Sequence, residues 1–207
     1  AFEMGAPFSS FRGRGETVLV LADQILVSGV NFLTGLILAR FLGLDGYGQY
    51  VLAFGTILFL SGSQIALIAS PMMVRGPVLK GREAQSYYHA VLVTQIAFSV
   101  LSAGAILLLS HVLSTFFSSW TLWNLALPLS GVALFFSMQD FTRRYLFSVN
   151  RAYSVLMADL CSYGMRLLLL LLFGLNSGLS PSWALWIIAG ASAIGSLFSL
   201  AQCPEII

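Results

Sequence analysis

Charged residues are scarce in this 207-residue chain: Asp, Glu, Lys and Arg together make up 9% of it. Soluble domains carry roughly 25% charged residues, which cover the surface that faces water. Hydrophobic residues make up 58% of the chain, and its mean hydropathy is +0.89. A chain with so few charges lacks the side chains for a water-facing surface, and we expect its helices to lie in lipid.

Other signals are missing as well. The two cysteines, Cys161 and Cys203, lie in or at the end of apolar runs, and the sequence shows no spacing typical of a metal site. Walker A, GxSxG and HExxH motifs are absent. The net charge of +2 is too small to indicate nucleic acid binding. The sequence therefore predicts a protein that is not an enzyme and that has no cofactor, metal or nucleic acid partner.

Six apolar segments are each long enough to cross a bilayer, which takes about 20 residues. In lipid a helix satisfies all of its backbone hydrogen bonds within one segment. We therefore predict an all-α, polytopic membrane helix bundle, with a flexible leader at 1–15, a six-helix lobe at 16–203 and a truncated tail at 204–207. The predicted spans are 17–40, 48–70, 87–110, 122–142, 154–175 and 183–203.

The positive charges predict the orientation, because cytoplasmic loops are enriched in Lys and Arg. With six spans, eight of the ten cationic residues fall on one side of the membrane. Arg40 alone lies on the opposite side, and Arg166 lies inside the fifth span. Both termini of this multi-pass protein are therefore predicted to be cytoplasmic. The eight are Arg12, Arg14, Arg75, Lys80, Arg82, Arg143, Arg144 and Arg151.

The stretch ARFLGLDGYGQY joins the first two predicted spans. Its three glycines, Gly43, Gly46 and Gly48, can adopt the positive φ that a tight turn requires, so we expect a helical hairpin here. Arg40 stands at the end of the first span. There it would complement the helix dipole and reach the lipid headgroups.

Polar groups inside the spans are the candidate functional residues, since a charge at the bilayer centre costs about 2.5–3.5 kcal/mol on insertion scales. Asp23, Asn31 and Thr34 fall within about 80° of one another on a helical wheel of the first span. This polar face either lines an aqueous lumen with a proton or cation site, or makes hydrogen bonds between helices. Gln95 belongs to a weaker polar face on the third span.

The fifth span carries Asp159, Tyr163 and Arg166 at i, i+4 and i+7, on one helical face. About 10 Å of helix axis separates Asp159 from Arg166, which is long for a direct ion pair. Arg166 therefore either joins a buried charge network through Tyr163 or binds an anionic ligand. Phosphate matches the geometry of a guanidinium well.

The segment NFLTGLILARFLGLDGYGQYVLAFGTILFL (31–60) resembles the polysaccharide-biosynthesis transporters of the multidrug/oligosaccharidyl-lipid/polysaccharide exporter superfamily, which includes the O-antigen (Wzx-type) flippases. Residues 40–43 match the family's Arg-hydrophobic-hydrophobic-Gly turn. Residues 48–50 match the Gly-x-Tyr that opens its second helix. The stretch QDFTRRYLFSVNRAYSVLMADL (139–160) is similar to the basic loop between its helices four and five.

The resemblance implies the N-terminal lobe of a two-lobe transporter in the bacterial inner (cytoplasmic) membrane. Such a protein moves a polyprenyl-pyrophosphate-linked oligosaccharide by alternating access, for O-antigen, lipopolysaccharide or other surface polysaccharide. Arg166 would then hold the pyrophosphate, and Asp23 and Asp159 would couple protons. The implied partners are membrane lipid, lipid-linked oligosaccharide, and a second lobe, a second copy or another polysaccharide-assembly membrane protein. The other candidates for lumen residues are Asn31, Tyr163 and Gln95.

Three alternatives stay open on the sequence alone. A multidrug cation antiporter would favour an acidic cavity without Arg166. A membrane enzyme acting on lipid-linked sugar would need clustered acids or a large loop. A non-transporting membrane subunit would use its polar faces for helix packing only. Convergence of the polar candidates on one cavity would favour transport, and separate helix contacts would favour the subunit.

Overall fold

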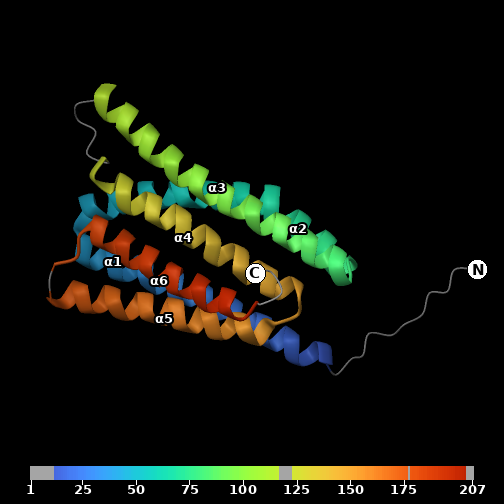
Figure 1. Cartoon of the computed structure of the whole chain (residues 1–207). Helices are drawn as coiled ribbons and strands as arrows, with labels where there is room; N and C mark the ends of the chain where they lie inside the picture. Colours follow the sequence, from blue (N-terminus) through green and yellow to red (C-terminus); the bar gives the residue numbers. More distant parts are fainter. Residues whose placement is uncertain (1–11, 117–122, 177, 204–207) are drawn as a thin grey trace, which may run out of the picture.

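The computed structural model describes residues 12–116, 123–176 and 178–203, and these ranges contain helices and no strands (Figure 1). The all-α prediction is confirmed for them. Two short elements follow the first helix: the π-helical η1 (Ile65–Ala69) and the 3-10 helix η2 (Gly76–Val78). The α-helices are α1 (Arg12–Gln64), α2 (Ser70–Arg75), α3 (Gly81–Phe116), α4 (Trp123–Ser148), α5 (Ala152–Asn176) and α6 (Pro181–Ala201).

Five helices of the described ranges are long and apolar enough to cross a membrane. They are the continuous helical run Gly15–Val78 and the helices α3, α4, α5 and α6. Most of the observed helices extend beyond the predicted spans. The predicted spans cover apolar residues only, whereas the helical backbone hydrogen bonds continue through the polar residues that flank them. The predicted leader at 1–15 falls mostly outside the described residues, but α1 already begins at Arg12. The predicted tail at 204–207 lies outside them entirely.

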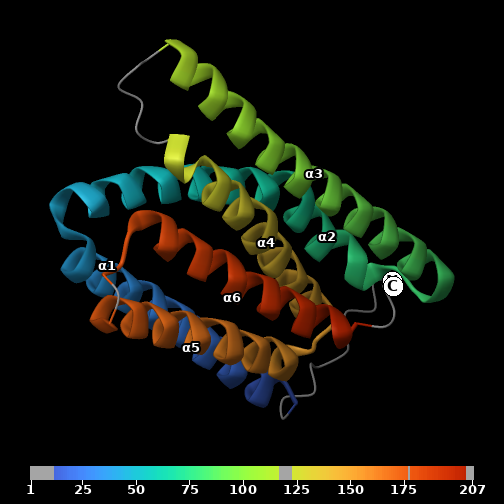
Figure 2. The same ribbon diagram turned by 60° about the vertical axis from the view of Figure 1, so that its left-hand side comes forward.

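The chain reverses direction inside α1 at one residue (Figure 2). Gly43 has φ 67° and ψ −178°, a backbone conformation that is essentially restricted to glycine. Gly46 and Gly48 keep helical backbones, so the turn expected over residues 43–48 is made by Gly43 alone. Gly46 has another role: a Cβ added there would lie 3.5 Å from Cγ of Pro181, so the turn packs closely against the start of α6.

Local sequence explains where the last helices begin. Ser180 caps α6, since its hydroxyl accepts the backbone N–H of Trp183 at 3.3 Å, and Pro181 occupies the first helical turn. Between α4 and α5 the backbone reverses at Asn150, which has φ 58°. Asn is one of the few residues besides glycine that tolerate this left-handed conformation.

α4 lies at the centre of the bundle and contacts α1, α3, α5 and α6, most extensively α6. In Figure 2, α3 lies on one outer side, and α5 lies with the first part of α1 on the other. Two apolar clusters of buried residues join the described helices. One includes Leu38, Leu129 and Leu185; the other includes Phe141 and Tyr145.

The two ends of the bundle differ in charge. α1 begins and α6 ends at the same end, beside the α2–α3 and α4–α5 connections (Figure 1). There, Nη1 of Arg151 donates to the carbonyl of Gln202 at 2.5 Å, and the hydroxyls of Tyr88 and Ser148 lie 3.3 Å apart. We call this the charged end and the opposite one, with Gly43, the turn end. The charged end carries Arg75, Lys80, Arg82, Arg143, Arg144 and Arg151.

Candidate functional site

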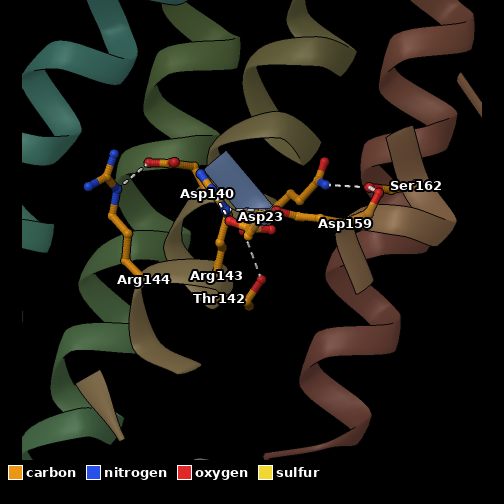
Figure 3. Close-up of polar contacts among 8 residues, drawn as sticks. Asp23, Asp140, Thr142, Arg143, Arg144, Asp159 and Ser162 are labelled. Atoms are coloured by element: carbon orange, nitrogen blue, oxygen red, sulfur yellow. Dashed lines mark hydrogen bonds and ion pairs between the residues drawn. The ribbon is translucent and has the colours of Figure 1, made fainter. Parts of the chain in front are cut away.

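Three charged side chains from three helices meet inside the bundle (Figure 3). Arg143 of α4 points inward and forms ion pairs with Asp23 of α1 and with Asp159 of α5. The distance from Nε of Arg143 to Oδ2 of Asp159 is 2.7 Å. Both carboxylates are only 1% exposed. Removing charges from water is costly, so each carboxylate depends on the guanidinium to remain buried.

α4 and its neighbours add neutral polar groups to this site (Figure 3). Nε2 of Gln139 donates to the hydroxyl of Ser162 at 2.6 Å, and the hydroxyl of Thr142 donates to the carbonyl of Gln139 at 3.0 Å. α6 can approach because residue 195 is glycine. A Cβ added to Gly195 would lie 2.8 Å from Cβ of Ser162 and 3.0 Å from Nε2 of Gln139.

Arg144 follows Arg143 in sequence but turns to a different partner. Its Nε lies 2.7 Å from Oδ2 of Asp140, one helical turn earlier in α4. The two side chains are 26% and 14% exposed, so this ion pair lies at the edge of the bundle. Adjacent arginines thus have different surroundings: one joins three helices, and the other makes a local pair within its own helix.

Arg166 lies deeper along α5 and is 1% exposed. Its guanidinium carbon lies 4.6 Å from the centroid of the Tyr163 ring, and its Nη1 donates to Oδ1 of Asn31 at 3.4 Å. Its Nε and Nη2 have no hydrogen-bond partner among the described residues. Asp159, on the same face of α5, is paired with Arg143 instead. The charge of Arg166 therefore has no carboxylate partner in the described part of the chain.

Asn31 belongs to a polar face of α1 that points out of the bundle. Gln24, Ser28 and Asn31 fall within about 60° of one another on the helical wheel, and all three are exposed. Asp23 and Thr34 are buried, so the polar face expected for Asp23, Asn31 and Thr34 divides into an inner and an outer part. We call Gln24, Ser28 and Asn31 the α1 stripe. Lipid offers these groups no hydrogen bonds, so the stripe is suited to water or to another protein.

Gln95 lies in a different polar contact, between α3, α4 and the end of α1. Its Nε2 donates to the hydroxyl of Ser99 at 3.0 Å, and Nε2 of Gln64 donates to the carbonyl of Ser137 at 3.0 Å. The hydroxyls of Ser99 and Ser137 are 2.7 Å apart. Each of these four residues is at most 6% exposed. The hydrogen bonds of Gln95 go to Ser99 and Ser137 and not to Arg143 or Arg166, so the polar candidates occupy separate helix contacts in this conformation.

Two cavities lie elsewhere in the bundle. A mainly apolar cavity of about 420 Å³ opens between α1, α3 and α4 and is lined by Leu52, Ile106 and Leu129 among others. Another, of about 360 Å³, lies beside Arg40 near the turn end. Neither of the two is lined by the ion-paired aspartates or by Arg166. Within the described ranges, no group of three His, Cys, Asp or Glu residues could hold a metal ion.

Comparisons with models of protein families, with curated proteins and with solved structures give no match for this chain. The resemblance to polysaccharide flippases therefore stays a prediction.

Arg143 is the main residue that sequence reasoning missed. The predicted span 122–142 leaves Arg143 in the following loop, whereas α4 continues to Ser148 and carries Arg143 on a helical face. Gln139, Thr142 and Arg143 stand at i, i+3 and i+4, a spacing that places them on one face. This periodicity was the available signal that Arg143 points inward.

Proposed function

We propose that the chain is a six-span lobe of a transporter that moves a lipid-linked oligosaccharide with a phosphate-bearing head group across a bacterial cytoplasmic membrane. The observation that carries this proposal is the position of Arg166, a buried guanidinium without a carboxylate partner that reaches the α1 stripe through Asn31. Phosphate and pyrophosphate suit such a guanidinium. The stripe supplies a polar surface along which the head group can approach it.

The reversal at Gly43 supports six crossings. The helical run Gly15–Val78 has 64 residues and would extend about 95 Å if it were straight. The hydrocarbon core of a bilayer is about 30 Å thick. Folded at Gly43, the run gives two limbs that each suffice for one crossing, and α3 to α6 supply four more. The charged end then faces the cytoplasm.

The ion-paired site is suited to coupling. Asp23 and Asp159 share one guanidinium, so protonation of either carboxylate would weaken the contact of α4 with α1 or with α5. A proton could thereby change which helices are held together. The remainder of the translocation path would come from a second lobe, a second copy or another membrane protein of polysaccharide assembly.

One alternative has an observation in its favour. The polar candidates lie in separate helix contacts, and the contact of Gln64, Gln95, Ser99 and Ser137 is closed by packing, as expected for a non-transporting membrane subunit. In that case another protein would cover the α1 stripe. A multidrug cation antiporter fits less well, because the charge of Arg166 would repel a cationic substrate.

Thiol labelling tests whether the α1 stripe faces water. In a Cys161→Ser background, Ser28→Cys and Asn31→Cys should react with a membrane-impermeant maleimide in intact membranes. Ile25→Cys is the matched control, since Ile25 is 73% exposed but lies on the apolar side of α1. Stripe cysteines as unreactive as Ile25→Cys would mean that no aqueous path exists, and the transport proposal would fail.

An export assay tests Arg166 directly. In cells whose surface polysaccharide depends on the gene for this protein, Arg166→Gln should lower export at least about tenfold, since a hydrogen bond to a charged group contributes about 1.5–3 kcal/mol. Arg40→Gln is the matched control, because Arg40 is exposed and makes no ion pair among the described residues. Normal export by an Arg166→Gln protein present at normal membrane levels would remove Arg166 from substrate binding.

A further inference from the structure

The cations of the charged end fall into two groups with different surroundings. In the α4–α5 group, Arg143 and Arg144 are held by carboxylates, and Arg151 donates to a backbone carbonyl. In the α2–α3 group, Arg75, Lys80 and Arg82 are all exposed and form no ion pair within the described residues. Three positive charges thus remain available along the short connection between α2 and α3. The group is defined by Arg75, Lys80 and Arg82, and we call it the basic turn.

The basic turn borders a cavity of about 510 Å³. Arg75 lines it from the end of α2 and Leu79 from the α2–α3 connection. The first turns of α3 supply Arg82, Glu83, Ser86 and Tyr87. The guanidinium of Arg75 lies 5.7 Å from the centroid of the Tyr87 ring. The hydroxyl of Tyr87 donates to the carbonyl of Pro71 at 3.2 Å, which holds the ring in place beneath Arg75.

Positive charge predominates around this cavity. Arg75 and Arg82 line it beside a single carboxylate, that of Glu83, and Glu83 makes no ion pair among the described residues. The first turn of α3 adds unpaired backbone N–H groups and the positive end of a helix dipole. Two guanidinium groups, a seryl hydroxyl and a helix start are suited to the several oxygens of a phosphate group.

Exposed apolar side chains close in sequence to the cavity residues indicate where that phosphate comes from. Met73 and Val74 at the end of α2 are 40% and 75% exposed, and Val78 of η2 is 75% exposed. They stand close in sequence to Arg75 and Leu79, which line the cavity. Exposed apolar groups interleaved with cations are suited to a membrane interface, where the former enter the acyl region and the latter meet headgroups. A free phosphate ion would make no use of the apolar side chains.

We propose that the cavity of the basic turn binds the phosphate headgroup of an anionic membrane lipid. Arg75 and Arg82 contact the phosphate, Lys80 adds to the local positive potential, and Val74 and Val78 lie against the lipid chains. The proposal does not depend on transport: the site lies on the bundle surface, and none of its residues belongs to the contacts of Arg143 or Arg166. It would equally serve a non-transporting membrane protein.

Native mass spectrometry of the 207-residue chain in a neutral detergent tests the proposal. The chain is titrated with phosphatidylglycerol, with phosphatidylcholine and with inorganic phosphate. Wild-type protein should retain phosphatidylglycerol in preference to phosphatidylcholine, and inorganic phosphate should not displace it. Each cation near an anionic lipid surface changes affinity about fivefold. Arg75→Gln with Arg82→Gln should therefore lower retention about 25-fold.

Two further variants distinguish the site from general effects of charge or folding. Glu83→Gln removes the one carboxylate of the cavity and should raise phosphatidylglycerol retention about fivefold, a gain that misfolding would not produce. Arg144→Gln removes a cation of the same end that is already paired with Asp140 and should leave retention unchanged. The proposal would be overturned if the double variant or Glu83→Gln left phosphatidylglycerol retention unchanged. It would also be overturned if Arg144→Gln lowered retention as much as the double variant does. Displacement of the lipid by inorganic phosphate at equal concentration would overturn the assignment to a lipid.

Discussion

Arg143 and Asp159 form an ion pair across the α4–α5 contact, with 2.7 Å between Nε and Oδ2. The same guanidinium pairs with Asp23, so one residue of the central helix holds carboxylates from two neighbouring helices, α1 and α5. All three side chains lie within helices, and the two carboxylates are buried. Without this guanidinium, both carboxylates would be buried without the counter-charge that these ion pairs supply, which is unfavourable in a low-dielectric interior.

Replacing Arg143 should destabilise the bundle strongly. Arg143→Gln leaves two carboxylates buried without a counter-charge, and removing one partner of a buried pair costs about 3–5 kcal/mol. Arg144→Gln removes an arginine from the edge pair with Asp140, where an exposed pair contributes about 0–1 kcal/mol. Thermal unfolding of both variants in detergent measures the difference. Equal losses for the two arginines would show that the inner ion pairs add nothing to stability.

The close approach of α6 to the Arg143 site should depend on Gly195. Gly195→Ala places a Cβ 2.8 Å from Cβ of Ser162, and overpacking of this kind costs about 1–3 kcal/mol. Gly190→Ala lies in the same helix, where an added Cβ meets nothing within 4 Å, and should be neutral or slightly stabilising. Unfolding in detergent compares the two. A Gly195→Ala protein as stable as Gly190→Ala would contradict the packing described here.

The reversal in α1 should tolerate only glycine. Gly43→Ala forces a side chain into a backbone region that costs non-glycine residues about 1–3 kcal/mol. Gly48→Ala, in the helical limb that follows, meets nothing within 4 Å and should not destabilise the protein. The difference between the two variants in thermal unfolding measures the strain. Equal stability of Gly43→Ala and Gly48→Ala would show instead that a longer, adjustable loop makes the turn.

Gln95 and Arg166 should differ in their effect on export. Gln95 contacts Ser99 and the Ser137 carbonyl in a closed helix contact, so Gln95→Leu should lower stability by no more than about 1–2 kcal/mol and leave export unchanged. The same export assay that tests Arg166→Gln measures this. Loss of export with Gln95→Leu, at normal protein levels, would show that the α3–α4 contact opens to the substrate.

The helices could be predicted from the sequence because long apolar runs leave few alternatives in lipid. The reversal between the first two spans was also predictable, since three glycines in six residues interrupt an apolar run. Which glycine makes it was not, because Gly43, Gly46 and Gly48 have equal conformational freedom and differ only in what packs around them. Gly46 is close to Pro181, a contact that depends on tertiary structure.

Partner choice among charged residues could not be predicted in the same way. Asp159 and Arg166 share one face of α5, yet each finds its partner on another helix: Arg143 for Asp159 and Asn31 for Arg166. Helical periodicity gives the direction of a side chain relative to its own axis, not the rotation of the helix within the bundle. For the same reason Asp23 and Asn31, expected on one face of α1, divide between the interior and the surface.

The one-residue corner at Gly43 limits how the first two helical limbs can move. A loop of several residues would let the limbs slide past each other along their axes, but a corner without slack forbids such piston motion. What stays available is pivoting, in which the limbs open and close like a hinge while their distances from Gly43 stay constant. On one side of the corner Phe41 packs against Gly174 of α5, and on the other side Gly46 lies close to Pro181 of α6. The pivot is therefore fixed to the last turns of α5 and to the start of α6.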